Sequence, residues 1–259
     1  MPDAPRPRLP RTEGRPLVLG HRGASAEAPE NTLVAFRLAL EQGADGVELD
    51  VWRCASGEVV VIHDRDARRV AGSPLRPALA SFAELRALEV GAWKGERFRG
   101  ERIPRLEEVL EALGPAVVNV ELKSERVGDP RLAFAAARVL RARPAAERVL
   151  VSSFDWVLLA AFRLAAPEVA TGLLLEARSP WRRLAGPAAA LLRPQALHPQ
   201  LGWVTPERAR RWEAAGRPLV VWTVDEPADV ERMCALGAAA LVSNLPGRTR
   251  ELVRRATGR

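Results

Sequence analysis

Two of the three histidines in this 259-residue chain lie near acidic and basic residues in the sequence. His21 is followed by Arg22, and His63 comes shortly after the acidic pair Glu48 and Asp50. Histidine is the side chain whose unperturbed pKa lies nearest neutrality, so it can take up and release a proton at physiological pH. A structural role is the alternative for each histidine, but a chain with so few of them that places two beside acidic pairs favours proton transfer.

A second group of chemically useful residues follows later in the chain, at Glu121 and Lys123. Residues i and i+2 of a strand project from the same face, so Glu48 points with Asp50, and Glu121 with Lys123. Carboxylate ligands without cysteine suit Mg²⁺ or Ca²⁺ better than zinc. Simple salt bridges at strand ends, or a pair between Glu121 and Lys123, are the alternative interpretations.

Together these residues predict chemistry on a phosphate ester. A divalent ion with Arg22 and Lys123 would clamp a phosphate group, and such electrostatic stabilisation is usually the largest catalytic contribution. His21 and His63 would then serve as general acid and general base, each worth roughly 10²–10⁴-fold. The sequence leaves open which histidine plays which part.

Three further residues are possible members of the site. Glu30 either touches the site or only complements the first turn of the following helix. His198 precedes a proline and is structural or part of the site. Trp222 either belongs to the core or forms a pocket wall.

Alternating strand-like and helix-like runs are expected to position these residues. Apolar runs of strand type occur at 17–20, 46–51, 116–122, 149–152, 170–175, 196–197, 218–224 and 240–242. Helical patterns follow them, the first from a cap at Asn31 or Thr32 to Gly43, then at 106–113, 130–141, 155–165, 181–192, 206–215, 229–236 and 248–255.

The order of these runs predicts the fold class. Eight strand–helix units in about 250 residues match an α/β protein of the TIM (β/α)₈ barrel type in number and size. A doubly wound sheet is the alternative, but no Gly-x-Gly-x-x-Gly follows any strand. In a barrel, the C-terminal strand ends form one mouth, where the candidate residues would gather.

An extra antiparallel return strand is predicted at 58–62, after the turn at 55–57. A turn centred near residue 56 sets Asp50 opposite Ile62 and therefore places His63 beside the acidic pair. Residues 64–104 break the repeat, with Gly-bearing loops and a short helix near 82–88, and are interpreted as a small insertion.

The ends and the composition narrow the class of protein. Residues 1–16 are rich in Pro and Arg and predict a disordered tail before a single domain at 17–259, with no signal peptide. No apolar run approaches the ~18 residues that a membrane span needs, so the cytoplasm is the expected location. The two cysteines, Cys54 and Cys234, suggest no disulfide framework.

The net charge of +7 raises the question of nucleic acid binding. The arginines are scattered among 32 acidic residues, and no DNA-binding motif is present, so no nucleic acid partner is expected. A small anionic substrate remains the expected partner, and the oligomeric state is left open.

The motifs in their joint order resemble the glycerophosphodiester phosphodiesterase family. The resemblance covers residues 17 to about 250 and rests on these segments: His-Arg-Gly at 21–23, Pro-Glu-Asn-Thr at 29–32, Glu-Leu-Asp at 48–50, His-Asp at 63–64, Arg-Ile-Pro at 102–104, Glu-Leu-Lys at 121–123 and Trp-Thr-Val at 222–224. It implies a TIM barrel that hydrolyses glycerophosphodiesters to glycerol 3-phosphate and an alcohol with a divalent cation. It also implies that the small insertion at 64–104 lies over the barrel mouth. Two departures stand at Asn244 and Asp225, where the family commonly has Asp and Asn.

The resemblance also implies roles for individual residues. The implied metal ligands are Glu48, Asp50 and Glu121. The implied acid–base pair is His21 and His63, and the implied substrate-binding residues are Arg22, Lys123 and Trp222. A phospholipase D-like or C-like activity on lysolipids is the second hypothesis, and an inactive phosphate-binding barrel is the third. The preferred headgroup and the native metal stay open.

Overall fold

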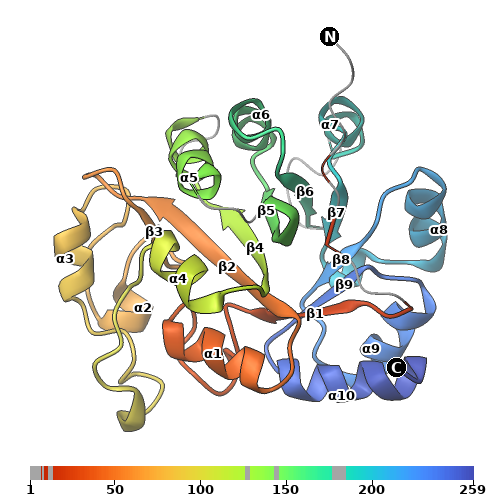
Figure 1. Ribbon diagram of the computed structural model, residues 1–259, viewed down its shortest axis with the longest axis horizontal. Coiled ribbons are helices and arrows are strands. Elements are labelled where there is room, and N and C mark those ends of the chain that lie inside the picture. Colours follow the sequence, from red (N-terminus) through yellow and green to blue (C-terminus); the bar gives the residue numbers. More distant parts are fainter. Residues whose placement is uncertain (1–6, 8, 11–13, 126–128, 143–145, 177–184) are drawn as a thin grey trace.

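The computed structural model describes residue 7 and the ranges 9–10, 14–125, 129–142, 146–176 and 185–259. Parallel strands stand side by side in its centre, and helices surround them (Figure 1). The strands are β1 (Leu17–His21), β2 (Gly46–Arg53), β3 (Val59–Val61), β4 (Val117–Leu122), β5 (Val149–Ser153), β6 (Ala170–Leu175), β7 (Ala196–Pro199), β8 (Val220–Trp222) and β9 (Ala240–Ser243). Within the described ranges, every strand except β3 runs parallel to its neighbours.

The sheet closes into a barrel. Its strands follow the order β7-β6-β5-β4-β2-β1-β9-β8, and parallel bridges from Leu197 to Leu219 and from Gln200 to Trp222 join its two ends. The TIM barrel prediction is therefore confirmed, and the doubly wound alternative is excluded because that sheet stays open.

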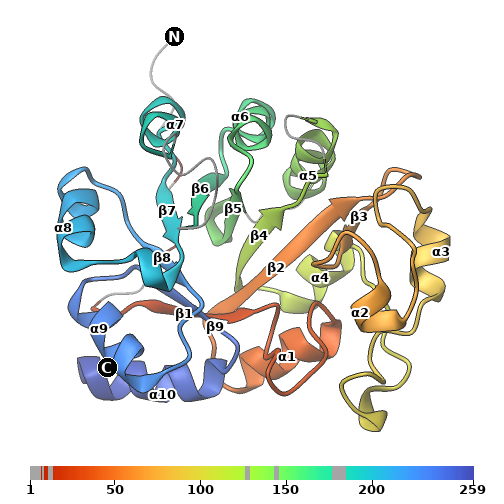
Figure 2. The ribbon, with the colours of Figure 1, turned by 180° about the vertical axis from the view of Figure 1, so that it is seen from behind.

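The helices form the outer layer, as the view from behind also shows (Figure 2). They are α1 (Leu33–Glu41), α2 (Arg68–Ala71), α3 (Phe82–Ala87), α4 (Leu106–Leu113), α5 (Arg131–Arg141), α6 (Trp156–Ala165), α7 (Ala185–Leu192), α8 (Pro206–Ala214), α9 (Pro227–Ala235) and α10 (Pro246–Thr257). Except for α2 and α3, these helices pack their apolar faces against the outside of the strands in one large core. None of the described helices is long and apolar enough to cross a membrane.

The barrel interior holds a separate core. Small and branched side chains fill it below the mouth, among them Leu19, Leu150, Ala170 and Val242. Strands that are buried on both faces read as continuous apolar runs, which explains why the sequence located them well. The main difference is β8, which covers only Val220–Trp222 of the expected 218–224.

The return strand has the predicted register. β3 pairs antiparallel with β2 through Val51 and Val61, and the Ile62 amide donates to the Asp50 carbonyl at 3.0 Å. His63 follows directly, so the hairpin brings it back to the end of β2.

The insertion builds a small core of its own beside this hairpin, around Trp52, Val60, Leu85 and Ile103. It contains α2 and α3 rather than the single helix that the sequence predicted. The insertion touches the barrel mouth, because the Lys94 ammonium donates to the carbonyl of Ser25 at 2.7 Å.

Arg15, two residues before β1, is attached to the barrel. Residues 1–6, 8 and 11–13 of the expected tail lie outside the described ranges, but the Arg15 guanidinium donates two hydrogen bonds to Asp45, at 2.7 and 2.6 Å. The part of the expected 181–192 helix before Ala185 also lies outside those ranges.

Candidate active site

Three carboxylates from two adjacent strands converge at the barrel mouth. Glu48 and Asp50 lie on β2, and Glu121 lies on β4 directly opposite Asp50 in the parallel register. One oxygen from each of the three lies within 4.8 Å of the others, and all three side chains are buried. The alternation of strand side chains therefore builds the acidic cluster that the sequence indicated.

The donor set fits a hard divalent cation. It offers only carboxylate oxygens, the ligands that Mg²⁺ and Ca²⁺ prefer, and it lies at the mouth of the barrel. The Lys123 ammonium already lies between two of these groups, 3.0 Å from Asp50 Oδ1 and 2.5 Å from Glu121 Oε1. The cluster is thus built around positive charge.

Arg22 joins the cluster from the end of β1. Its backbone lies in the left-handed region (φ 56°), and its amide donates to the Glu48 carbonyl at 2.8 Å and to Glu48 Oε2 at 3.2 Å. Its guanidinium lies 3.3 Å from Asp50 Oδ2 and donates to Glu30 Oε1 at 2.9 Å. Glu30 therefore contacts the cluster through Arg22.

The positive charges of Arg22 and Lys123 give Glu48 and Asp50 very different pKa values. Burial and the charges of Asp50 and Glu121 raise the pKa of Glu48 well above its usual value. Burial also acts to raise the pKa of Asp50, but Lys123 and Arg22 outweigh it and hold that pKa well below its usual range. Two carboxylates on one strand face thus differ because the cations contact Asp50 more closely.

His63 stands at the edge of this cluster and is held by a carboxylate. Its Nδ1 lies 2.7 Å from Asp64 Oδ1, and the Arg69 guanidinium from α2 donates to the other oxygen of Asp64 at 2.8 Å. Arg69 also donates to both oxygens of Glu30, at 2.6 and 2.8 Å. One arginine of the insertion therefore links the partner of His63 to the partner of Arg22.

His21 faces the cluster from the other side. Its Nε2 lies 4.0 Å from Glu48 Oε2, and its Nδ1 lies 2.7 Å from the side-chain oxygen of Asn244. Burial lowers the pKa of His21, and the neighbouring Arg22 charge lowers it further. Burial also lowers the pKa of His63, although Asp50 opposes the shift.

A cavity of about 220 Å³ connects these groups. Its lining includes His21, His63, Lys123, Phe154 and Trp222. The two aromatic rings meet edge to face with centroids 5.8 Å apart, and the Trp222 indole N–H donates to the His198 carbonyl at 2.7 Å. The cavity thus has a charged side and an apolar side, as a ligand with a phosphate and a carbon chain requires.

His198 lines the same cavity but differs from the other two histidines. It is 1% exposed, and no hydrogen-bond partner for its Nε2 occurs among the described residues. The ring fills the space beside Gly172, where an added Cβ would lie 2.2 Å from Nε2. Burial lowers its pKa to about 3, so at neutral pH this imidazole is uncharged.

Replacing His198 with phenylalanine is expected to make the fold less sensitive to acid. A histidine that is buried neutral takes up a proton on unfolding, so its contribution to stability is complete above about pH 6.5 and falls as the pH drops toward 3. The slope is about 1.4 kcal/mol for each pH unit. Urea unfolding of both proteins between pH 7 and pH 4 measures the difference, and parallel stability curves would contradict the buried neutral state.

Several residues of the site were not singled out from the sequence. Asn31, expected at most as a helix cap, instead takes φ 58° and donates its amide to Asp50 Oδ2 at 2.9 Å, while Thr32 caps α1. Asparagine tolerates this conformation better than most residues, which is the signal that the sequence offered. Arg69 and Phe154 carried no such signal, because only folding brings them to the mouth.

The two departures from the family pattern touch each other. The Asn244 amide donates to Asp225 Oδ2 at 2.7 Å, and the Asn244 backbone N–H donates to Asp225 Oδ1 at 2.8 Å. The exchanged residues therefore form a pair, and this pair also contacts His21.

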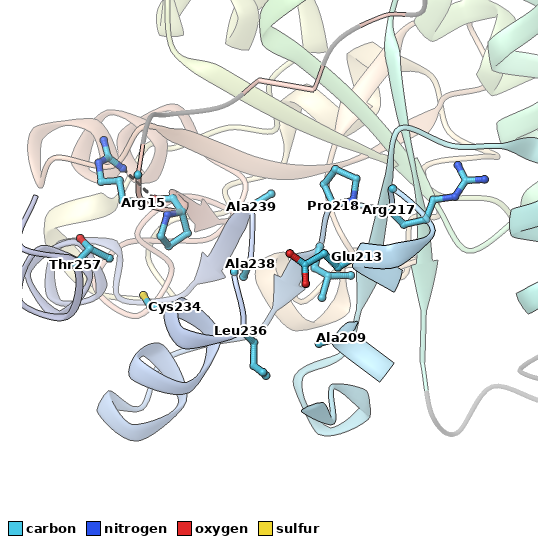
Figure 3. A pocket seen from close by; sticks show the side chains of 15 residues that line it. Arg15, Ala209, Glu213, Arg217, Pro218, Cys234, Leu236, Ala238, Ala239 and Thr257 are labelled. Atoms are coloured by element: carbon cyan, nitrogen blue, oxygen red, sulfur yellow. Dashed lines mark hydrogen bonds between the residues drawn. The ribbon is translucent and has the colours of Figure 1, made fainter. Parts of the chain in front are cut away.

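A larger cavity, of about 400 Å³, lies at the opposite end of the barrel (Figure 3). It is bordered by Arg15, Glu213, Arg217 and Cys234 near the starts of β8 and β9. Arg15 is paired with Asp45, outside the cavity lining, and Arg217 donates to the carbonyl of Pro194. The described residues therefore form no coupled cluster of charged groups there that compares with the one at the mouth. Size alone does not mark the site, since the perturbed groups gather at the smaller cavity.

Comparison with known proteins agrees with this geometry. The model of the glycerophosphoryl diester phosphodiesterase family matches residues 21–248. A glycerophosphodiester phosphodiesterase of Caldanaerobacter subterraneus is 36% identical over 243 residues, which cover 92% of this chain and 98% of that protein.

Solved structures show the same architecture. A phosphodiesterase of Oleispira antarctica, in complex with the product sn-glycerol 3-phosphate, has a TM-score of 0.85 at 28% identity, covering 92% of this chain and 97% of that one. A glycerophosphodiester phosphodiesterase of Thermotoga maritima has a TM-score of 0.76 at 28% identity, covering 93% and 100%. By sequence, fold and the chemistry gathered at its barrel mouth, this chain belongs to the glycerophosphoryl diester phosphodiesterase family.

Proposed function

We propose that this chain hydrolyses glycerophosphodiesters to sn-glycerol 3-phosphate and an alcohol, with the help of Mg²⁺ or Ca²⁺. One observation carries the proposal: two histidines, a buried carboxylate cluster and the basic side chains of Arg22 and Lys123 line the same cavity. The product in the Oleispira relative supports glycerol 3-phosphate as the product here.

The ion would be held by Glu48, Asp50 and Glu121. When bound, it supplies a positive charge that polarises the phosphoryl group and offsets the charge that develops on its oxygens. Arg22 and Lys123 lie beside the same carboxylates and present donors to the phosphate oxygens. Arginine suits this task because its planar fork matches phosphate geometry.

The histidines carry the protons. One takes a proton from the attacking hydroxyl, which is either the glycerol 2-hydroxyl or a water, as the new P–O bond forms. The other gives a proton to the departing alcohol oxygen as the old P–O bond breaks. If the 2-hydroxyl attacks, a cyclic phosphate forms first, and a water then opens it to glycerol 3-phosphate.

The remaining residues bind and orient. Glu30 holds the Arg22 guanidinium, and Asp64 holds His63. Trp222 and Phe154 offer apolar surface for the glycerol carbons, and neutral His198 supports Trp222 through its backbone carbonyl. In the cell, this reaction would recover glycerol 3-phosphate from deacylated phospholipid headgroups in the cytoplasm.

Release of glycerol 3-phosphate from a panel of glycerophosphodiesters tests the proposal. The panel includes the choline, ethanolamine, glycerol and inositol diesters, each assayed in EDTA and after Mg²⁺ or Ca²⁺ is restored. We expect release that EDTA abolishes and one of the two ions restores, and the ranking of the diesters reveals the preferred headgroup.

An acylated diester serves as the contrasting substrate. Turnover of a lysophospholipid without turnover of any deacylated diester would replace the proposal with a lysolipid-specific phosphodiesterase. Binding of glycerol 3-phosphate without turnover of either class would indicate an inactive phosphate-binding barrel.

A further inference from the structure

A chain of hydrogen bonds reaches the ring of His21 from two strands away. Asp225 follows β8, Asn244 follows β9, and His21 ends β1, so the three residues lie on adjacent strand ends of the mouth. Asn244 contacts His21 Nδ1 through its side-chain oxygen at 2.7 Å and contacts Asp225 through its side-chain nitrogen at 2.7 Å.

The carboxylate fixes the orientation of the Asn244 amide. An ionised carboxylate only accepts hydrogen bonds. Asp225 accepts from the Asn244 backbone N–H at 2.8 Å, from the Ser243 hydroxyl at 2.8 Å and from the Asn244 side chain. The amide NH₂ must therefore face Asp225, which leaves the amide oxygen facing His21.

The orientation of the amide in turn decides the protonation of the imidazole. The amide oxygen is an acceptor, so His21 Nδ1 must carry a hydrogen. The Ser25 hydroxyl donates to the same oxygen at 2.9 Å, which is consistent with an acceptor at that position. A neutral imidazole carries only one ring hydrogen, so Nε2 then holds the lone pair.

We infer that Asp225 and Asn244 are positioning residues that hold neutral His21 in its Nδ1–H tautomer. Nε2, the nitrogen nearer to Glu48, is thereby kept as the proton-accepting atom of the ring. The opposite tautomer would set a ring lone pair against the amide oxygen at a distance where a hydrogen bond should form. The inference rests on the proposed function for its catalytic meaning, but the tautomer itself can be measured without any substrate.

Nitrogen-15 NMR of histidine side chains provides the direct test, because the chain contains only three histidines. At pH 8, which is above the usual pKa of histidine, the wild-type protein should show His21 protonated on Nδ1. The two ring nitrogens of a neutral imidazole have well-separated shifts, so the tautomer is read directly. A His21 signal protonated on Nε2 would overturn the inference.

The Asp225→Asn variant should no longer hold His21 in a single tautomer. An asparagine at 225 can donate as well as accept, so the Asn244 amide is free to turn and His21 populates both tautomers. Loss of an outer partner of a site residue typically costs roughly tenfold to a hundredfold in activity. We expect kcat to fall within that range with KM almost unchanged, and the His63 signals to stay constant, because His63 is held by Asp64.

The reciprocal double variant, Asp225→Asn with Asn244→Asp, is expected to restore the single tautomer. The carboxylate at 244 would accept from His21 Nδ1 and from the amide at 225. Most of the lost kcat should return, whereas a residue that only stabilises the loop would not be rescued by the exchange. Asp229→Asn is the matched control, since it makes the same acid-to-amide change at a carboxylate that pairs with Arg232 on α9, and it should change kcat less than about twofold.

The outcomes separate the inference from the proposed function. A wild-type Nδ1–H tautomer with no turnover of any diester would refute the function and keep the inference. A single tautomer and unchanged kcat in Asp225→Asn would refute the inference and keep the function. If Asp225→Asn fails to fold, the wild-type tautomer alone still decides.

Discussion

Replacing His63 with alanine is expected to lower kcat by roughly 10²–10⁴-fold, the contribution of one general acid or base. The side chain is 31% exposed at the edge of the mouth, so its removal leaves no cavity in the core. Stability should therefore change little, and the loss should lie in kcat rather than in KM, because in the proposed mechanism the ring moves a proton and does not bind the phosphate. Steady-state kinetics on the best diester of the panel, together with thermal unfolding, measure both.

Arg68→Ala is the matched control for this variant. Arg68 lies on α2 beside Arg69, but its ion pair is with Asp66, and its side chain is 66% exposed. This change removes a nearby positive charge without touching the network that holds His63, so kcat should stay near the wild-type value. A His63→Ala protein with near wild-type kcat would exclude His63 from the proton transfer.

Replacing Glu121 with glutamine is expected to affect the metal-free and metal-bound proteins in opposite directions. Burial raises the pKa of Glu121 despite its contact with Lys123, so its charge costs the folded state free energy at neutral pH. The neutral isostere removes that cost, and the variant in EDTA should be at least as stable as the wild type. The same change removes one of the three carboxylates proposed to hold the ion and should abolish turnover.

The quantity to measure is the rise in Tm when Mg²⁺ or Ca²⁺ is added. An ion at 100 times its Kd stabilises the folded state by about 2.7 kcal/mol, which corresponds to roughly 5–10 °C in Tm for a protein of this size. The wild-type Tm should rise by that amount with Mg²⁺ or Ca²⁺, and the Tm of the Glu121→Gln variant should not. Glu96→Gln, at a 75% exposed position paired with Arg99, should keep the full response.

An equal rise in Tm for Glu121→Gln and wild type would show that the ion binds without Glu121. A variant less stable than wild type in EDTA would instead show that the ion pair with Lys123 outweighs the desolvation of Glu121. The rise in Tm with metal tests whether Glu121 binds the ion, and the stability in EDTA tests the cost of its buried charge, so the experiment tests the two separately.

The sequence by itself determined the elements and the faces of the strands. Parallel strands buried on both sides read as continuous apolar runs, and the period of two placed Glu48 with Asp50 before any contact was known. The short hairpin was also predictable, because a turn near residue 56 fixes the register that brings His63 back to Asp50. These features depend on neighbours that are close in the sequence.

The tertiary structure alone decided how these residues are held. Asn244 contacts His21 across 223 positions of the chain, and Arg69 joins Glu30 to Asp64 only because the insertion folds back onto the barrel mouth. Such pairs follow no local period, and which strand ends become neighbours depends on the closure of the barrel. The sequence was therefore enough to predict which side chains could do the chemistry. The residues that hold those side chains depend on packing between distant segments, and the same packing sets the tautomers and the charges.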